Sequence, residues 1–475
     1  MRIYFIGIGG IGMSAVAGLA KGLGFEVSGS EENPLYPPSS LILEELGIKV
    51  LKPSEENLSE FTPDLVVVGN AVRATHLEVE KAKALGLPIL SFPEFIEKYL
   101  LPEKKALVVA GTHGKTTTSA LLSFSLTRLA QDPSFLVGGI LKNTGKNFAT
   151  GKGEFMVLEG DEYPSAFFDP NPKFLHYRPF GLILTSLEYD HADVYPDLSS
   201  LKEVFEKLLK LLPQEGILIF NRDDPTLEEI VKTLEPYCKA ITYGMHKGAH
   251  FRLLESDCFF NGKTFQNKGK VRTSSGEIFE IELSIPGKYN LLNALSTLAL
   301  LEALGFERAE ILDVFRDFKG VVRRQDILYA SEDLLVIDDF AHHPTALALT
   351  LEELKKAFKP ERTILFFEPR TNSSKRKVFQ EEYVKSLGLA DLIGIKVPPG
   401  LEKIPPQERI DLSYLKRELE GLGKRAFILE NGCLGYELLN PEGKTLVVFM
   451  SSAFMKEEIR LFLDSLMRSH GKDPG

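Results

Sequence analysis

Cysteine is scarce in this 475-residue chain, and no long basic segment is present. The three cysteines, Cys238, Cys258 and Cys433, are far apart and give neither a metal-ligand spacing nor a disulfide framework. This pattern is typical of a protein in a reducing cytoplasm. The net charge of −10 at pH 7 argues against a nucleic-acid partner held by phosphate contacts, although it leaves room for a local pocket that binds a small anion.

Long uninterrupted apolar runs are also lacking. The N-terminal stretch up to about Leu23 resembles a signal peptide, but glycines interrupt it at 7, 9, 10 and 12, and no A-x-A site follows. We therefore expect a strand, a turn and a helix there. No other run approaches about 18 apolar residues, so we predict no membrane span.

The segment Val108–Thr118 carries the clearest chemical signal. An apolar strand stops at Gly111, and Gly114 and Lys115 then lead into a helical stretch. Backbone N–H groups of such a loop surround phosphate oxygens, the lysine adds a positive charge, and the next hydroxyl can bind Mg²⁺. The loop is a shortened G-x-x-G-K-T, because Val109 stands where the longer P-loop pattern has its first glycine. It predicts a nucleoside triphosphate site.

A second glycine loop, Gly7-x-Gly9-x-x-Gly12, follows the first predicted strand and enters a helix. Glu31 and Glu32 lie just beyond the second predicted strand. By itself this pattern fits a dinucleotide, with an acid on the ribose hydroxyl, and another diphosphate such as that of a UDP-sugar about equally well.

Strand-like runs alternate with helical segments along the chain, which predicts parallel α/β sheets, and the length predicts two to four domains. We expect an α/β fold of three domains: an N-terminal Rossmann-like domain (1–102), a central P-loop ATPase domain with a mostly parallel sheet (103–320) and a C-terminal Rossmann-like domain (321–475). The expected strands are Arg2–Ile6, Asp64–Val68, Ala106–Ala110, Phe155–Leu158, Leu182–Thr185, Ile217–Phe220, Leu334–Ile337, Thr363–Phe367, Leu392–Lys396 and Leu446–Met450.

One stretch of the central segment departs from this pattern. Residues 251–286 alternate in the manner of antiparallel hairpins. We expect turns at Gly262, Gly269 and Ser274–Gly276.

Acidic residues follow two predicted strands near the phosphate loop. Glu159 ends one strand, and Glu188, Asp190 and His191 follow the next. The carboxyl ends of parallel strands face the crevice where ligands bind, so these groups could hold Mg²⁺ on a γ-phosphate. The alternative is solvated acids at loop starts, and a histidine is an unusual ligand for Mg²⁺.

Two further segments place polar residues at a strand end and a helix start. Residues 338–344 could reach a ribose or a phosphate, but they make a poor zinc motif, because no third spaced ligand follows and adjacent residues on a strand diverge. Asn290 and Asn293 lie one turn apart on a helix that runs to Leu304. They could read an adenine edge, or serve as a cap and a buried polar residue.

Taken in order, these motifs resemble the Mur ligases, the ATP-dependent amide-forming enzymes of peptidoglycan synthesis, over nearly the whole chain. His113 and His342-His343 are similar to the branch that accepts UDP-N-acetylmuramate. Residues 159–169, 173–179 and 367–372 are similar to members that add the tripeptide L-alanyl-γ-D-glutamyl-meso-diaminopimelate. Departures from the family pattern are Pro164, Phe340 and Ser451–Phe454.

The resemblance implies an ADP-forming ligase of peptidoglycan recycling that uses ATP and Mg²⁺. The lactyl carboxylate of UDP-N-acetylmuramate would form an acyl phosphate, which the peptide amine then attacks. The N-terminal domain would hold the UDP diphosphate, and the C-terminal domain the peptide. We expect a monomer or weak homodimer in the cytoplasm, with no nucleic-acid or membrane partner.

The resemblance also implies the site residues. Catalytic residues would be Lys115, His113, Glu159 and His191, and metal ligands Thr116, Glu159 and His191. ATP would contact Gly111, Thr112, His113, Gly114, Lys115, Thr116, Thr117, Asn293, Arg324 and Asp339. The UDP-sugar would contact Gly7, Gly9, Gly10, Ile11, Gly12, Ser30, Asn70, Asn143 and Asn147. The peptide would contact Arg370, Asn372 and Lys375.

Three alternative functions stay open at this point. The nearest is addition of L-alanine, in place of the tripeptide, to UDP-N-acetylmuramate. An NAD-dependent oxidoreductase with a P-loop module would explain Gly7–Gly12 and Glu31, but it gives Glu159 and His191 no role. A non-catalytic nucleotide-binding regulator would bind ATP without releasing phosphate.

Overall fold

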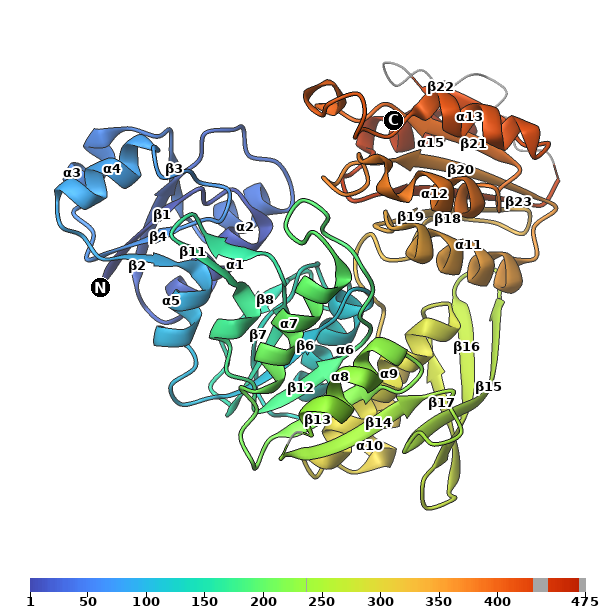
Figure 1. The fold of residues 1–475 in the computed structure, drawn as a ribbon, viewed down its shortest axis with the longest axis horizontal. Helices are drawn as coiled ribbons and strands as arrows, with labels where there is room; N and C mark the ends of the chain where they lie inside the picture. The colour runs from blue at the N-terminus through green and yellow to red at the C-terminus, as the bar shows by residue number, and fades with distance from the viewer. Residues whose placement is uncertain (236, 430–442, 470–475) are drawn as a thin grey trace.

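The computed structural model describes residues 1–235, 237–429 and 443–469 (Figure 1). Cys433 lies outside these residues. Three main sheets follow one another along the chain, and helices pack against them. This confirms the predicted α/β class. No helix in the described ranges is long and apolar enough to span a membrane.

The first sheet is parallel and has the order β3-β2-β1-β4-β5. At the centre of this sheet, β1 and β4 are apolar and almost wholly buried, as strands covered on both faces require. The strands are β1 (Arg2–Ile6), β2 (Glu26–Ser30), β3 (Lys49–Leu51), β4 (Leu65–Val68) and β5 (Ile89–Ser91). The helices are α1 (Ile11–Gly22), α2 (Ser39–Glu45), α3 (Glu55–Phe61), α4 (Leu77–Ala84) and α5 (Phe92–Tyr99).

The central sheet has the order β17-β16-β15-β14-β13-β12-β6-β9-β7-β8 and is parallel from β15 to β7. Its strands are β6 (Lys105–Ala110), β7 (Ser134–Leu136), β8 (Phe148–Ala149), β9 (Phe155–Gly160), β12 (Gly181–Leu184), β13 (Ile217–Asn221), β14 (Lys239–Gly244), β15 (Phe251–Phe260), β16 (Phe265–Thr273) and β17 (Ile278–Leu283). The segment also has the small pair β10 (Pro164–Ala166) and β11 (Asp169–Pro172), and the helices α6 (Lys115–Arg128), η1 (Lys173–His176), α7 (Leu198–Leu209), α8 (Pro225–Leu234), α9 (Lys288–Ala303) and α10 (Arg308–Arg316).

The third sheet has the order β18-β19-β23-β20-β21-β22, and only β18 runs antiparallel to its neighbour. Its strands are β18 (Asp326–Ala330), β19 (Leu334–Asp339), β20 (Arg362–Glu368), β21 (Leu392–Lys396), β22 (Arg425–Leu429) and β23 (Thr445–Ser451). Its helices are α11 (Pro344–Phe358), η2 (Lys377–Phe379), α12 (Gln380–Leu387), η3 (Leu401–Lys403), α13 (Leu412–Gly421) and α15 (Lys456–Ser469).

The antiparallel hairpins predicted for residues 251–286 are present as β15, β16 and β17. Turns do occur around Gly262 and Gly276, both at positive φ. The turn predicted at Gly269 is wrong, because this residue lies inside β16 and pairs with Ser256 and Ile281. A Cβ there would lie 2.8 Å from the side chain of Leu253, so packing rather than chain reversal requires the glycine.

The β15–β16 hairpin reaches the third sheet. Phe265, at the start of β16, belongs to the same buried cluster as the inner face of α11. Figure 1 shows the hairpin beside α11. The three sheets fall within the three predicted ranges; the boundaries at 102 and 320 stay a prediction.

Candidate active site

A cleft of about 1190 Å³ lies where the three sheets meet. Parallel strands in the central sheet end at this cleft, as ligand sites in α/β sheets require. All three segments contribute lining residues. Among them are Gly10, Asn70, Lys115, Glu159, Asn293, Arg324, Asp339 and His343.

The phosphate loop joins β6 to α6 along one wall of the cleft. Gly111 and Gly114 have φ values of 136° and 81°, which side chains rarely adopt. A Cβ on Gly114 would lie 2.6 Å from Asn293 Oδ1. No side chain caps the start of α6, so its first-turn N–H groups and positive helix end are available to an anion.

Lys115 points its charge at Glu162. Its Nζ lies 2.9 Å from Glu162 Oε2 and 2.6 Å from the carbonyl oxygen of Gly111. Burial lowers the pKa of Lys115, but the Glu162, Asp161 and Glu159 carboxylates together outweigh burial, and the net direction is upward. The lysine therefore stays charged, and a phosphate would have to compete with Glu162 for it.

Thr116 and Glu159 provide the oxygen donors that Mg²⁺ prefers. Thr116 Oγ1 donates to Glu159 Oε1 at 2.8 Å, at the foot of the phosphate loop. Glu159 Oε2 accepts from the Gly138 N–H at 2.6 Å. A hydroxyl and a carboxylate that already face each other fit a cation bound beside the nucleotide phosphates.

His191 lies in the same cleft but contacts other partners. Its Nε2 is 2.6 Å from Glu162 Oε1, and its Nδ1 is 2.8 Å from the Tyr163 hydroxyl. Burial lowers the pKa of His191, and Glu162 raises it beyond that effect. The structure thus joins His191 to Lys115 through Glu162, and no contact joins it to Glu159 among the described residues.

Glu162 is the main site residue that the motif analysis did not single out. It is 2 % exposed, and it contacts both Lys115 and His191. Its position three residues after Glu159, just past the end of β9, was the available signal. The spacing alone did not show that the chain turns back toward the lysine.

The other predicted nucleotide contacts converge on the same wall. Arg324 Nη2 donates to Thr116 Oγ1 at 3.2 Å, and its guanidinium lies 4.4 Å from the centre of the Phe340 ring. Burial raises the pKa of Asp339, which accepts from the Gln325 N–H at 2.8 Å. Asn293 Nδ2 donates to Asn290 Oδ1 at 3.2 Å and lines the cleft.

A second cavity of about 680 Å³ lies over the first glycine loop and shares Gly10, Met13 and Asn70 with the main cleft. Gly7, Gly9 and Ser30 line it, while Ile11 and Gly12 line the main cleft. The Gly9 N–H donates to Glu31 Oε2 at 2.9 Å, and the Ser30 hydroxyl is bonded to buried Glu78.

Asn143 and Asn147 line neither cavity. Asn143 Nδ2 donates to the carbonyl oxygen of Asp317 at 2.8 Å, and its Oδ1 accepts from the Lys319 N–H. Asn147 is fully buried and donates to the carbonyl oxygen of Val137. The structure therefore gives both residues local structural partners, and their predicted sugar contacts stay a prediction.

The predicted peptide residues follow β20. Arg370 Nη1 lies 3.5 Å from buried Glu368, and its side chain is 40 % exposed. Asn372 Nδ2 donates to Asp193 Oδ2 at 3.0 Å. Burial lowers the pKa of Lys375, and the Arg370 charge adds to that effect. Of this stretch Thr371 lines the main cleft, so the three side chains lie beside it rather than inside it.

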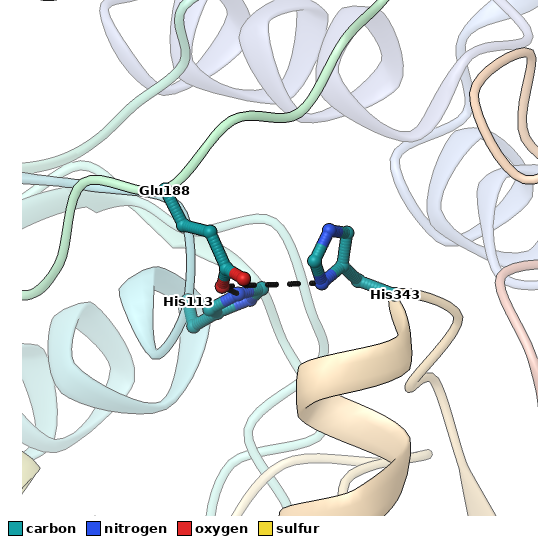
Figure 2. A group of neighbouring side chains, drawn as sticks. All are labelled: His113, Glu188 and His343. Carbon is teal, nitrogen blue, oxygen red and sulfur yellow. Dashed lines mark hydrogen bonds and ion pairs between the residues drawn. The ribbon is translucent and has the colours of Figure 1, made fainter. Parts of the chain in front are cut away.

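His113, Glu188 and His343 form a second side-chain cluster, shown in Figure 2. His113 Nε2 lies 2.8 Å from Glu188 Oε2, and His343 Nδ1 lies 4.0 Å from the same oxygen. His343 is the residue before α11, and its Nδ1 accepts from the Thr345 N–H. Burial lowers the pKa of His343, and neighbouring His113 lowers it further. His113 was predicted as a catalytic residue and ATP contact, Glu188 was considered as a Mg²⁺ ligand, and His343 lies in the segment considered for ribose or phosphate contacts. Their meeting in one cluster was not predicted.

Three models of the Mur ligase family match three consecutive parts of the chain. "Mur ligase family, catalytic domain" matches residues 2–102, and "Mur ligase middle domain" matches residues 109–301. "Mur ligase, glutamate ligase domain" matches residues 323–402.

Individual relatives carry two different names. UDP-N-acetylmuramate–L-alanyl-gamma-D-glutamyl-meso-2,6-diaminoheptandioate ligase of Escherichia coli K12 is 34 % identical over 84 % of this chain and 85 % of its own length. UDP-N-acetylmuramate–L-alanine ligase of Clostridium kluyveri is 33 % identical over 85 % of this chain and 84 % of its own length. The crystal structure of UDP-N-acetylmuramate-alanine ligase MurC from Thermotoga maritima has a TM-score of 0.81, with 28 % identity, and covers 99 % of this chain and 100 % of that one.

Proposed function

The chain belongs to the Mur ligase family, whose members are ATP-dependent amide ligases of peptidoglycan synthesis, and from this premise we propose that it joins UDP-N-acetylmuramate to the tripeptide L-alanyl-γ-D-glutamyl-meso-diaminopimelate. The product would be a UDP-muramyl tripeptide, formed with release of ADP and phosphate. Recycled cell-wall peptide would be the source of the amine.

The observation that carries the proposal is the continuity of the cleft. Its lining runs from Gly10 and Asn70, past Lys115, to His343 and Thr371. One cleft can thus hold a nucleotide sugar, a triphosphate and an amine at the same time, which an amide ligation through a phosphorylated acid requires.

We assign the second cavity to the UDP part of the sugar substrate, because Gly10 at the start of α1 has no side-chain cap among the described residues and leaves an anion-binding helix end. The muramyl carboxylate would then point into the main cleft beside the phosphate loop. Asn70 borders both cavities and is placed to contact the sugar between them.

In the proposed reaction the lactyl carboxylate attacks the γ-phosphorus of ATP, and ADP leaves. The peptide amine then attacks the acyl carbon, and phosphate leaves with the two electrons of the carbon–oxygen bond. The first step brings together two anionic substrates, so charge cancellation is its main requirement. Lys115 and the first-turn N–H groups of α6 supply it from the protein.

Mg²⁺ would add positive charge at the phosphates, held by Thr116 and Glu159. Asn293, Arg324 and Asp339 would contact the nucleotide, and His191 would act through Glu162 to set how tightly Lys115 is held. Arg370 and Lys375 would bind peptide carboxylates, a role for which a planar guanidinium is well suited.

Addition of L-alanine is the second candidate, and the Clostridium kluyveri relative and the Thermotoga maritima structure favour it. One assay separates the two. Purified protein receives ATP, Mg²⁺ and UDP-N-acetylmuramate with either the tripeptide or L-alanine, and ADP release is followed together with product mass. We expect turnover with the tripeptide; turnover with L-alanine alone would replace our proposal by the second candidate.

A further inference from the structure

The cluster in Figure 2 is built from three separate segments. His113 belongs to the phosphate loop, Glu188 follows β12, and His343 precedes α11 of the third sheet. One ligand atom from each lies within 4.8 Å of the other two. Two imidazole nitrogens and a carboxylate oxygen are a donor set that suits zinc or cobalt better than magnesium.

The distances are close to those of a filled site. Ligands about 2.1 Å from a tetrahedral ion lie about 3.4 Å from one another. The two nitrogen-to-oxygen distances here, 2.8 Å and 4.0 Å, lie on either side of that value. The His343 nitrogen would have to move about 0.6 Å closer to the carboxylate oxygen to reach the spacing of a filled tetrahedral site.

Surrounding groups hold the carboxylate in the required orientation. The Thr345 hydroxyl donates to Glu188 Oε1 at 2.7 Å, which leaves Oε2 facing both imidazoles. The backbone of Glu188 is held from both sides by Thr112, whose hydroxyl donates to the Glu188 carbonyl oxygen and accepts from its N–H. Such outer partners are characteristic of metal-binding carboxylates.

His343 supplies a second, independent observation. It is 6 % exposed, its Nδ1 faces the cluster, and its buried Nε2 lies within hydrogen-bonding geometry of no atom among the described residues. An N–H at Nε2 leaves a lone pair on Nδ1, which is the form of histidine that binds a metal. This lone pair now accepts from the Thr345 N–H at 3.4 Å, a long contact that a bound ion would replace. Glu188 and His113 are 42 % and 25 % exposed, so an ion could enter from solvent and keep an open position.

We propose that His113, Glu188 and His343 bind one divalent transition-metal ion of the zinc or cobalt class, at a site separate from the oxygen donors Thr116 and Glu159. The ion would tie the phosphate loop to the start of α11, and so would join the central and C-terminal segments. The proposal does not depend on which amine the enzyme accepts.

The test titrates the full-length protein with Co²⁺ in excess Mg²⁺ and without nucleotide, by visible absorption and calorimetry. We expect one equivalent of bound Co²⁺ with the intense absorption of a low-coordinate site. His343→Asn keeps a good helix cap but removes the ring nitrogen. Loss of an outer partner already weakens metal binding about 10- to 100-fold, so this variant should weaken it at least as much.

Two controls make the result specific. His246→Asn changes an exposed histidine whose Nδ1 accepts from the Gly248 N–H, and it should bind Co²⁺ like the wild type. Glu159→Gln should also bind normally, because the two sites are separate. Unchanged Co²⁺ binding in His343→Asn, loss of binding in Glu159→Gln, or no binding by the wild type would each overturn the proposal. If His343→Asn does not fold, as judged by circular dichroism, Glu188→Gln replaces it with the same expected loss.

Discussion

Lys115, which we propose binds phosphate, is already paired with a carboxylate in the structure. Both oxygens of Glu162 lie within 3.0 Å of its Nζ, and Glu162 in turn contacts His191. Without a ligand, the lysine side chain is therefore held in one position, and its buried charge is paired. Exchange of one anionic partner for another costs less than desolvation of a lone charge.

Replacement of Lys115 by Ala tests this role. Loss of a donor that acts mainly at the transition state typically costs about 3 kcal/mol, so we expect turnover to fall at least about a hundredfold. Steady-state ADP release measures it. Lys207→Ala, a change at an exposed position of α7, should keep wild-type turnover. Near-normal turnover in Lys115→Ala would remove the lysine from the reaction.

Arg370 is exposed and only loosely paired, with its closest carboxylate oxygen 3.5 Å away on Glu368. It can therefore accept a substrate carboxylate without loss of a strong internal bond. Arg370→Ala should raise the KM for the tripeptide about tenfold or more and leave the KM for ATP unchanged, as expected for a charge-assisted contact. Initial rates over both substrate ranges check this, and an unchanged tripeptide KM would contradict the assignment.

Asp338 predicts how stability depends on pH. Burial raises its pKa to about 6, although the Arg323 guanidinium, 3.1 Å away, opposes this and Asp339 and Asp326 add to it. The same carboxyl has a pKa of about 3.9 in an unfolded chain. The folded protein thus keeps a proton that the unfolded chain has lost, so stability from this group is present below pH 4 and is lost as the pH rises through 6.

Asp338→Asn should remove that loss. The difference in free energy of unfolding between the variant and the wild type should rise by about 1 kcal/mol, in favour of the variant, when the pH is raised from 5 to 7. One pKa unit corresponds to about 1.4 kcal/mol. Urea unfolding of both proteins at pH 5 and pH 7 measures this difference at each pH. Comparison of the two values cancels any effect of the substitution that does not depend on pH. A difference that moves the other way would contradict the raised pKa.

At the scale of single elements, the strands were predictable because their sequences are buried on both faces. Runs such as Val108–Ala110 and Leu365–Phe367 have no exposed side chain and therefore read as continuous apolar segments. Gly269 was mistaken for a turn because a glycine inside a strand gives the same local signal. A glycine is required there because the side chains of Leu253 and Ile281 on the neighbouring strands leave no room for a Cβ. The local sequence cannot show this packing.

The candidate site divides in the same way. The local sequence was enough to predict Lys115, Glu159 and Thr116, because each lies at a strand end or a helix start that the neighbouring residues indicate. The cluster with Glu188 and His343 was not, since its members come from segments more than 70 residues apart in sequence. Residues 338–344 were judged a poor zinc motif because no third spaced ligand follows them in sequence. The tertiary structure brings two further possible ligands, His113 and Glu188, to His343.

The β15–β16 hairpin is the element that joins the central and C-terminal segments. Phe260 packs against Phe265 and against Phe358 of α11, with ring centres 5.1 Å and 5.8 Å apart. Phe265 is 2 % exposed, whereas Phe259 on the same hairpin is 42 % exposed.

Phe265→Ala should therefore cost about 3–5 kcal/mol of the stability of this junction, the usual price of a buried phenylalanine. Phe259→Ala is the matched control and should change stability by about 0.5 kcal/mol or less. Scanning calorimetry of the two variants checks the difference. Equal melting behaviour would show that the hairpin does not hold the C-terminal segment.

For the whole molecule, the nucleotide site that we propose includes a residue of the C-terminal segment. Arg324 comes from the connection just before β18, yet it is bonded to Thr116 at the start of α6. The centre of the Phe340 ring, just after β19, lies 4.4 Å from the Arg324 guanidinium. The second cavity, in contrast, has described lining residues from the N-terminal segment only. The affinity for ATP should thus depend on the position of the third sheet, whereas the affinity for the UDP-sugar should depend on it much less.

Arg324→Ala separates the two dependences. A hydrogen bond to a charged group contributes about 1.5–3 kcal/mol, so affinity for a non-hydrolysable ATP analogue should fall roughly tenfold to a hundredfold. Affinity for UDP-N-acetylmuramate should stay within about twofold, because no contact of Arg324 reaches the second cavity in the described structure. Calorimetric titration of both ligands tests this, with Arg316→Ala on exposed α10 as control. A parallel loss of both affinities would mean that Arg324 supports the arrangement of the whole chain rather than the nucleotide.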